Sequence, residues 1–115
     1  MAFKTVNAQE FERTLQQALP QGKFVLLDVY ADKGCNTCTK LDARAAIEHV
    51  YASAWHLLRL DADAPDSAQF LSRYRITGLP TLALFKPDDE HRMFIHVPDD
   101  DGKNVLEWLE AEATP

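Results

Sequence analysis

The chain has 115 residues, of which 46% are apolar and 26% charged, and its net charge is −6. A chain of this length can bury a hydrophobic core without disulfides, so we expect one domain over residues 1–115. The negative charge, with no cluster of Lys and Arg, argues against a nucleic-acid partner. No apolar run approaches the roughly 20 residues that a membrane span needs, which argues against direct membrane insertion.

The hydrophobic pattern predicts alternating strands and helices. Asn7 begins the first helix with Glu10 three residues later, the spacing of a capping box, and the Pro-Gln-Gly at residues 20–22 ends it. The second strand, F-V-L-L-D-V-Y at residues 24–30, is apolar on both faces, as in a central strand covered by helices on both sides. The other expected strands are residues 3–6, 57–62, 81–86 and 93–97, and the other expected helices are residues 36–54, 65–74 and 105–109.

This element order indicates an α/β protein. Right-handed crossovers make the early strands parallel, and the last two strands pair antiparallel. We therefore expect a central mixed sheet that ends in an antiparallel C-terminal hairpin, with helices on both faces. The acidic runs at residues 88–90 and 99–101 are expected to be solvated turns.

Cys35 and Cys38 are the two cysteines of the chain, and they follow the second strand. Side chains three apart on a helix lie about 5–6 Å apart, so a small adjustment closes a disulfide between them. A ring this short constrains the unfolded chain little, which favours reversible redox chemistry over stabilisation. Because a helix N-terminus favours a thiolate, we expect Cys35 to attack a substrate disulfide and Cys38 to resolve the mixed disulfide.

A C-x-x-C pair is also half of a zinc site. The four histidines are scattered, and only His91 and His96 have the spacing of a second ligand pair. Their offset of five would place them on opposite sides of a regular strand. Zinc stays an alternative to redox chemistry, but we expect neither a metal nor another cofactor.

Asp28 interrupts the apolar second strand and shares a face with Leu26 and Tyr30. Burial disfavours an ionised carboxyl, so we expect the pKa of Asp28 to be raised. The functional interpretation is a buried acid-base group that serves the inner thiol, Cys38. The alternative is a residue near the strand end that reaches solvent.

These segments together resemble the thioredoxin family over essentially the whole chain. The matching segments are F-V-L-L-D-V-Y-A, C-x-x-C, L-R-L-D-A-D and Y-R-I-T-G-L-P-T-L-A-L-F-K. The resemblance implies that Asp28 is the family's buried acid and that Pro80 follows a cis peptide bond. It also implies that Leu79 offers its main chain to the substrate, with Pro80 and Gly34 as further substrate-binding residues. Sequence alone would not make Pro80 cis, since only about 5–6% of such bonds are.

Within the family, F-K-T-V-N and L-D-V-Y-A-D are most similar to the C-terminal domains of membrane disulfide reductases of the DsbD type. This resemblance implies a thiol-disulfide oxidoreductase, acting as a reductase, with protein disulfides as substrates and a redox donor protein or domain as partner. We expect a monomer. The residues after Met1 lack the pattern of a signal peptide, which predicts the cytoplasm, or the periplasm if the chain is a domain of such a membrane protein.

Three positions depart from the family pattern. Lys33-Gly34 stands where the family usually has Trp before the first cysteine, and Asn36-Thr37 lacks the common proline. Leu57 occupies the place of a lysine that thioredoxins often carry near the buried acid, which leaves Asp28 without that partner. The lost aromatic side chain keeps a second function open, a thioredoxin-like binding module with little redox turnover.

Overall fold

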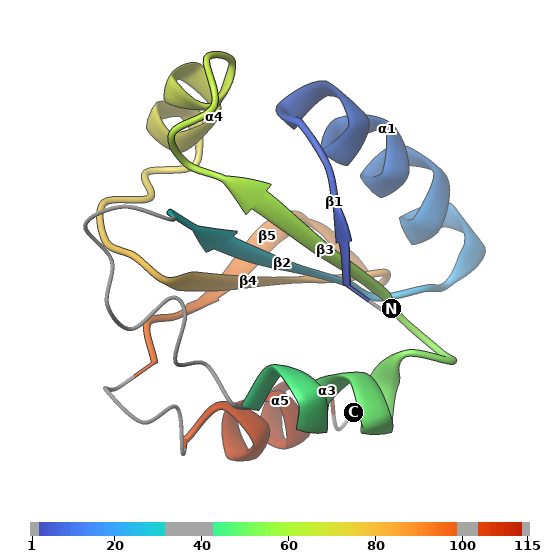
Figure 1. Ribbon diagram of the computed structural model, residues 1–115. Coiled ribbons are helices and arrows are strands. Elements are labelled where there is room, and N and C mark those ends of the chain that lie inside the picture. The colour runs from blue at the N-terminus through green and yellow to red at the C-terminus, as the bar shows by residue number, and fades with distance from the viewer. Residues whose placement is uncertain (1–2, 32–42, 99–103, 114–115) are drawn as a thin grey trace.

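The computed structural model describes residues 3–31, 43–98 and 104–113. In this part of the chain a five-stranded sheet has the order β1-β3-β2-β4-β5, and helices cover both of its faces (Figure 1). The expected α/β architecture with a central mixed sheet is confirmed. None of the helices in these residues is both long enough and apolar enough to cross a membrane.

Parallel and antiparallel pairing divide the sheet at its centre. β3 (His56–Asp61) lies between β1 (Phe3–Thr5) and β2 (Val25–Tyr30), and all three strands are parallel. On the other side, β4 (Thr81–Lys86) pairs antiparallel with β2 and with β5 (Asp89–His96). All six residues of β2 are buried, as the apolar pattern on both of its faces predicts.

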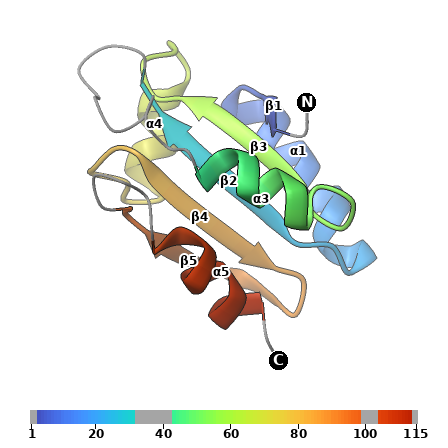
Figure 2. The ribbon, with the colours of Figure 1, turned by 60° about the horizontal axis from the view of Figure 1, so that its bottom comes forward.

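Two pairs of helices form the outer layers. α1 (Ala8–Ala18), which continues into the 3-10 turn η1 (Leu19–Gln21), covers one face together with α4 (Ser67–Arg73). α3 (Ala43–Tyr51) and α5 (Val105–Ala113) cover the other face, and Figure 2 shows them side by side over the sheet. The sheet therefore separates two hydrophobic cores.

Each core is built around a few fully buried side chains. Under α1, the ring of Phe11 contacts the rings of Phe70 and Phe85, both with centroids 5.3 Å away. Under α3 and α5, Ile47 and Leu109 pack against the opposite face of the central strands. Alternate residues of β2 thus enter different cores, which is the period of two expected of a strand.

The hairpin between β4 and β5 is tighter than the sequence predicted. Only Pro87 and Asp88 form the turn, and Asp89 already pairs with Lys86 as the first residue of β5. The expectation of a solvated turn over residues 88–90 is therefore correct only for Asp88, because the pairing of Lys86 with Asp89 extends the ladder to the turn. The second acidic run, residues 99–101, lies outside the described residues.

The predicted capping box at the start of α1 is present. The Asn7 side-chain oxygen accepts a hydrogen bond from the backbone N–H of Glu10 at 2.8 Å. The Glu10 carboxylate accepts one in return from the backbone N–H of Asn7 at 3.2 Å. These contacts satisfy two donors at this end of the helix.

Replacing Asn7 by Ala should lower the free energy of unfolding by about 1 kcal/mol, because the N-terminus of α1 loses its side-chain cap. Chemical denaturation of the two proteins measures this difference. Gln17→Ala is the matched control, since Gln17 is exposed within the same helix and Ala favours the helix. Equal losses in both variants would contradict a capping role for Asn7.

Candidate functional site

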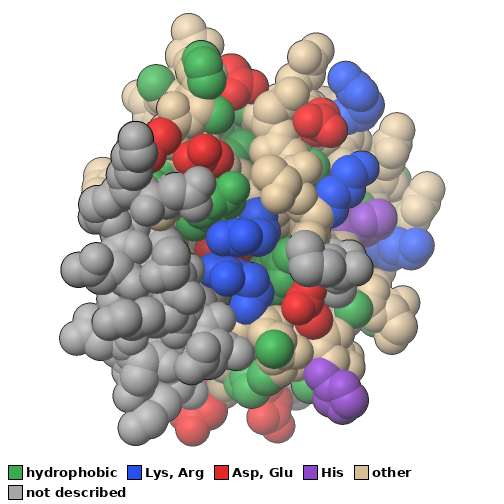
Figure 3. Space-filling view, viewed as in Figure 1, with side chains coloured by type: hydrophobic (Ala, Val, Ile, Leu, Met, Phe, Trp, Pro, Cys, Tyr) green, Lys and Arg blue, Asp and Glu red, His purple; other side chains and the backbone are tan. Residues whose placement is uncertain are grey.

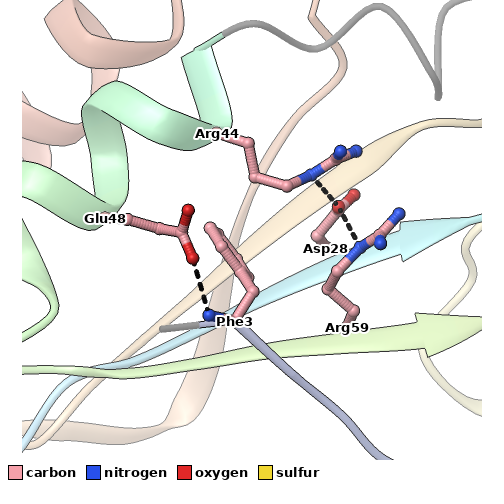
Figure 4. A network of polar contacts seen from close by, with 5 residues as sticks. All are labelled: Phe3, Asp28, Arg44, Glu48 and Arg59. Carbon is pink, nitrogen blue, oxygen red and sulfur yellow. Dashed lines mark hydrogen bonds and ion pairs between the residues drawn. The ribbon is translucent and has the colours of Figure 1, made fainter. Parts of the chain in front are cut away.

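Asp28 is buried on β2, the middle strand of the sheet. It is the fourth residue of β2, and its side chain has no exposed surface. Its Oδ2 atom accepts a hydrogen bond from Nε of Arg44 at 3.1 Å and another from Nε of Arg59 at 3.2 Å (Figure 4). Asp28, Arg44 and Arg59 together form the carboxylate cluster. The alternative in which Asp28 reaches solvent is therefore wrong.

The two arginines reach Asp28 from different elements. Arg59 lies on β3 directly opposite Asp28 in the parallel register, so its side chain projects from the same face of the sheet. Its guanidinium also lies over the ring of Tyr30, 3.9 Å from the ring centroid. This stacking directs the guanidinium along the sheet towards Asp28.

Arg44 belongs to the first turn of α3, and the next turn of the same helix also contacts the sheet. Glu48, four residues later, accepts a hydrogen bond from the backbone N–H of Phe3 at 2.9 Å. Residues four apart lie on one face of a helix, so one face of α3 binds both β2 and β1 (Figure 4). The position of Arg44 is thus set by two polar contacts between α3 and the sheet.

Opposing effects act on the ionisation of Asp28. Burial raises the pKa of Asp28 above its ordinary value of 3.8, and this effect is the larger. The positive charges and hydrogen bonds of Arg44 and Arg59 lower the pKa of Asp28 but do not cancel the effect of burial. The expected direction of the shift is confirmed. The other carboxylate oxygen, Oδ1, is buried and has no hydrogen-bond partner in the described part of the chain.

Asp28 has basic partners, although neither is the lysine that the family often carries. Leu57 pairs in register with Leu26 and belongs to the core under α3, two residues away from the position opposite Asp28. That position is held by Arg59. A basic residue therefore neighbours the buried acid, but it is Arg59, two residues after the position of Leu57.

The loop before β4 lies at the end of β2 from which the cysteine segment follows. The peptide bond between Leu79 and Pro80 is cis, as the resemblance implied. The Thr81 hydroxyl donates a hydrogen bond to the backbone oxygen of Gly78, and Thr81 pairs in register with Val29 near the end of β2. Pro80 is buried, and Leu79 packs against the core under α1.

The structure brings part of the predicted site together. Asp28, Leu79 and Pro80 lie at the same end of the sheet, the end at which β2 stops after Tyr30. Cys35, Cys38 and Gly34 fall in residues 32–42, outside the described residues.

Sequence reasoning missed Arg44 and Arg59. Arg59 had a signal, because it is a charged residue between Leu58 and Leu60 in an apolar strand. Arg44 had none, since a single arginine near the start of a helix is usually exposed.

Basic side chains gather near the middle of the face shown in Figure 3, with acidic side chains above and below them. The side chains of Arg44 and Arg59 are 21% and 25% exposed, so each guanidinium joins the buried carboxylate to the surface. Within residues 3–31, 43–98 and 104–113, no group of three or more His, Cys, Asp or Glu side chains is placed to hold a metal ion. Asp28 itself is a buried carboxyl group whose pKa is raised by burial.

Solved structures identify the fold class. The chain superposes on thioredoxin f from spinach chloroplast with a TM-score of 0.74, at 18% identity, covering 97% of this chain and 94% of that one. It also matches a chain in the crystal structure of the complex of ferredoxin:thioredoxin reductase and thioredoxin f2, with a TM-score of 0.78 at 19% identity, covering 97% and 96% of the two chains. The molecule has a thioredoxin fold.

Sequence comparison identifies the family. The family model for thioredoxin matches residues 2–109, so the chain belongs to the thioredoxin family. It is 38% identical over 102 residues to the thiol:disulfide interchange protein DsbD 2 of Pseudomonas aeruginosa, covering 79% of this chain and 16% of that protein. It is 36% identical over 97 residues to DsbD of Pseudomonas fluorescens, with the same coverage. The chain thus spans about one sixth of the length of these relatives.

Replacing Asp28 by Asn tests the raised pKa through stability. The folded protein holds this proton more tightly than the unfolded chain, where the pKa has its ordinary value of 3.8. The stabilisation is therefore complete below pH 3.8 and is lost as the pH rises through the folded-state pKa. We expect the stability of the natural protein, relative to Asp28→Asn, to fall as the pH rises.

Chemical denaturation over a range of pH, with the cysteines kept reduced, measures this difference. Asp66→Asn is the control, because Asp66 is exposed before α4 and its side chain makes no capping hydrogen bond. A stability difference between the natural protein and Asp28→Asn that grows with pH would mean that the pKa of Asp28 is lowered.

Proposed function

We propose that the chain is a thiol-disulfide oxidoreductase that reduces protein disulfides through Cys35 and Cys38. The observation that supports this most directly is Asp28, a fully buried carboxyl group with a raised pKa near the end of the strand that precedes both cysteines. A perturbed carboxyl beside a thiol pair is the arrangement expected of an acid-base group. The relatives named thiol:disulfide interchange proteins support the same reaction class.

In the proposed reaction, the Cys35 thiolate attacks one sulfur of a substrate disulfide, and the other substrate sulfur leaves as a thiolate that takes up a proton. A mixed disulfide between Cys35 and the substrate results. The Asp28 carboxylate then takes the proton of the Cys38 thiol, and the Cys38 thiolate attacks the sulfur of Cys35. The second substrate sulfur leaves as a thiolate and receives the proton that Asp28 releases, which returns Asp28 to its ionised form. The substrate gains two electrons and two protons, and the protein is left with a Cys35–Cys38 disulfide.

Substrate binding is proposed for Leu79, Pro80 and Gly34. Leu79 would pair its main chain with the extended substrate, and Pro80 would lie beside the reacting sulfurs. The position of the Leu79–Pro80 loop, next to the end of β2, supports this assignment. A redox donor protein or domain would return two electrons to the Cys35–Cys38 disulfide. The compartment is the periplasm if the chain is a domain of a DsbD-like protein, and the cytoplasm if it acts alone.

A second function is a thioredoxin-like binding module with little redox turnover. Lys33-Gly34 favours it, because it replaces the aromatic residue that the family usually has before the first cysteine. Such a module would form a stable complex with a partner protein while its thiols stayed inert.

Reduction of the disulfides of insulin, together with the equilibrium redox titration of the Cys35–Cys38 pair, tests the oxidoreductase. We expect reversible oxidation of the pair by two electrons and turnover that Cys35→Ser abolishes. A pair that does not oxidise reversibly, or turnover that survives Cys35→Ser, would contradict the proposal.

Trapping of mixed disulfides tests the separate roles of the two cysteines. The Cys38→Ser variant should accumulate a mixed disulfide with a substrate through Cys35, because the resolving thiol is gone. The Cys35→Ser variant is the matched control and should trap little. Preferential trapping through Cys38 would reverse the roles.

A further inference from the structure

We infer that Arg44 and Arg59 are positioning residues that make Oδ1 of Asp28 the oxygen that takes up and releases the proton. This inference rests on the proposed function, in which Asp28 accepts the proton of the Cys38 thiol. It goes beyond that function because it assigns the proton to one atom and names the two side chains that determine this choice.

The hydrogen bonds of the carboxylate cluster are unequal at the two oxygens. Arg44 and Arg59 both donate through Nε to Oδ2, at 3.1 and 3.2 Å, whereas Oδ1 has no hydrogen-bond partner in the described part of the chain. A guanidinium can only donate hydrogen bonds, and it stays protonated in proteins. A proton on Oδ2 would therefore have to displace one of two charge-assisted hydrogen bonds. A proton on Oδ1 displaces none.

The cluster holds this asymmetry because its two cations are fixed independently. Arg59 is set by the β2–β3 register and by its stacking on Tyr30. Arg44 is set by α3, which is attached to the sheet a second time through Glu48 and the backbone of Phe3. A rotation of the protonated carboxyl that exchanged its two oxygens would turn the O–H towards two guanidinium groups, which can only donate hydrogen bonds.

The positive charges of Arg44 and Arg59 explain how the fully buried Asp28 carboxyl can still act as a base. With Asp28 neutral, the cluster contains two positive charges, and with Asp28 ionised its net charge is one positive. Ionisation thus reduces an excess of partly buried positive charge instead of creating an isolated negative one. Of the neighbouring elements, β3 contributes Arg59 and α3 contributes Arg44 and Glu48.

The remaining neighbours add little charge to this row of the sheet. β2 itself contributes Tyr30, and β4 places the apolar Leu82 opposite Asp28. His96 on β5 is the next residue in the row beyond Leu82, and its ring stacks on Trp108 of α5. Among residues 3–31, 43–98 and 104–113, the charges that act on Asp28 are those of Arg44 and Arg59.

Infrared spectroscopy of the reduced protein, with Asp labelled by carbon-13, tests the position of the proton directly. A neutral Asp28 with its proton on Oδ1 has a carbonyl at Oδ2 that accepts two charge-assisted hydrogen bonds, so its stretching frequency is low. We expect Arg44→Gln and Arg59→Gln each to raise that frequency. The band is assigned by its loss in Asp28→Asn.

The matched control is Arg73→Gln, which removes an exposed arginine whose ion pair with Glu12 spans 3.4 Å. It should leave the Asp28 band unchanged. Arg59→Lys keeps a cation and provides a test should the Gln variants not fold. In Arg59→Lys, Asp28 should titrate near the same pH as in the natural protein. Its band should still shift, because an ammonium cannot reproduce the directed Nε–H. Bands unchanged in Arg44→Gln, Arg59→Gln and Arg59→Lys would overturn the inference.

Single-turnover kinetics links the position of the proton to the reaction. An opposite charge nearby changes the ionised fraction of a carboxyl by about tenfold or more. We therefore expect the rate at which Cys38 resolves the mixed disulfide to fall by about tenfold on the acid side in Arg44→Gln or Arg59→Gln. The midpoint of this pH profile should move upwards together with the titration of the Asp28 band, and Arg73→Gln should follow the natural protein.

The two proposals fail in different ways. Shifted bands in a protein that reduces no disulfide would support the position of the proton and contradict the proposed reaction. Normal disulfide reduction with unchanged bands and an unchanged pH profile would support the reaction and overturn the role of the arginines.

Discussion

The fold is organised around a carboxylate that has no access to water. A charge in such a place needs partners, and Asp28 has two guanidinium groups that reach it from a neighbouring strand and from a covering helix. The three residues come from β2, β3 and α3, so the ion pairs join the central strands to one outer layer. The hydrophobic cores attach the same layers over a wide area, and these contacts fix the direction of the Asp28 carboxyl group.

The contact between Asp28 and Arg44 joins the two elements on either side of the cysteines in the sequence. Asp28 lies before the cysteines and Arg44 after them, and the two side chains are in direct contact. Glu48 fastens the next turn of α3 to the backbone of β1. Residues 32–42 therefore begin and end at elements that are held together by the carboxylate cluster.

Most of the fold was predictable because periodicity is a local property. The run around Leu26 and Val29 is apolar on both faces, and Asn7 with Glu10 has the spacing of a cap, so a central strand and a helix start followed directly. The cis bond before Pro80 needed the family resemblance, since spacing does not distinguish it. Arg59 stands out as a charged residue in an apolar strand, but its contact with Asp28 depends on register. The contact of Arg44 depends on how α3 lies over the sheet, which no local pattern indicates.

The identity of the cations matters for the proposed chemistry. A lysine near a buried acid can itself lose its proton, so two groups would titrate together. Arginine stays charged, and with Arg44 and Arg59 only Asp28 changes its charge within the cluster. The solved structures are less than 20% identical to this chain and establish the fold alone. In the proposed reaction, a single titrating oxygen beside two permanent cations would give the site one proton to accept and one defined place to hold it.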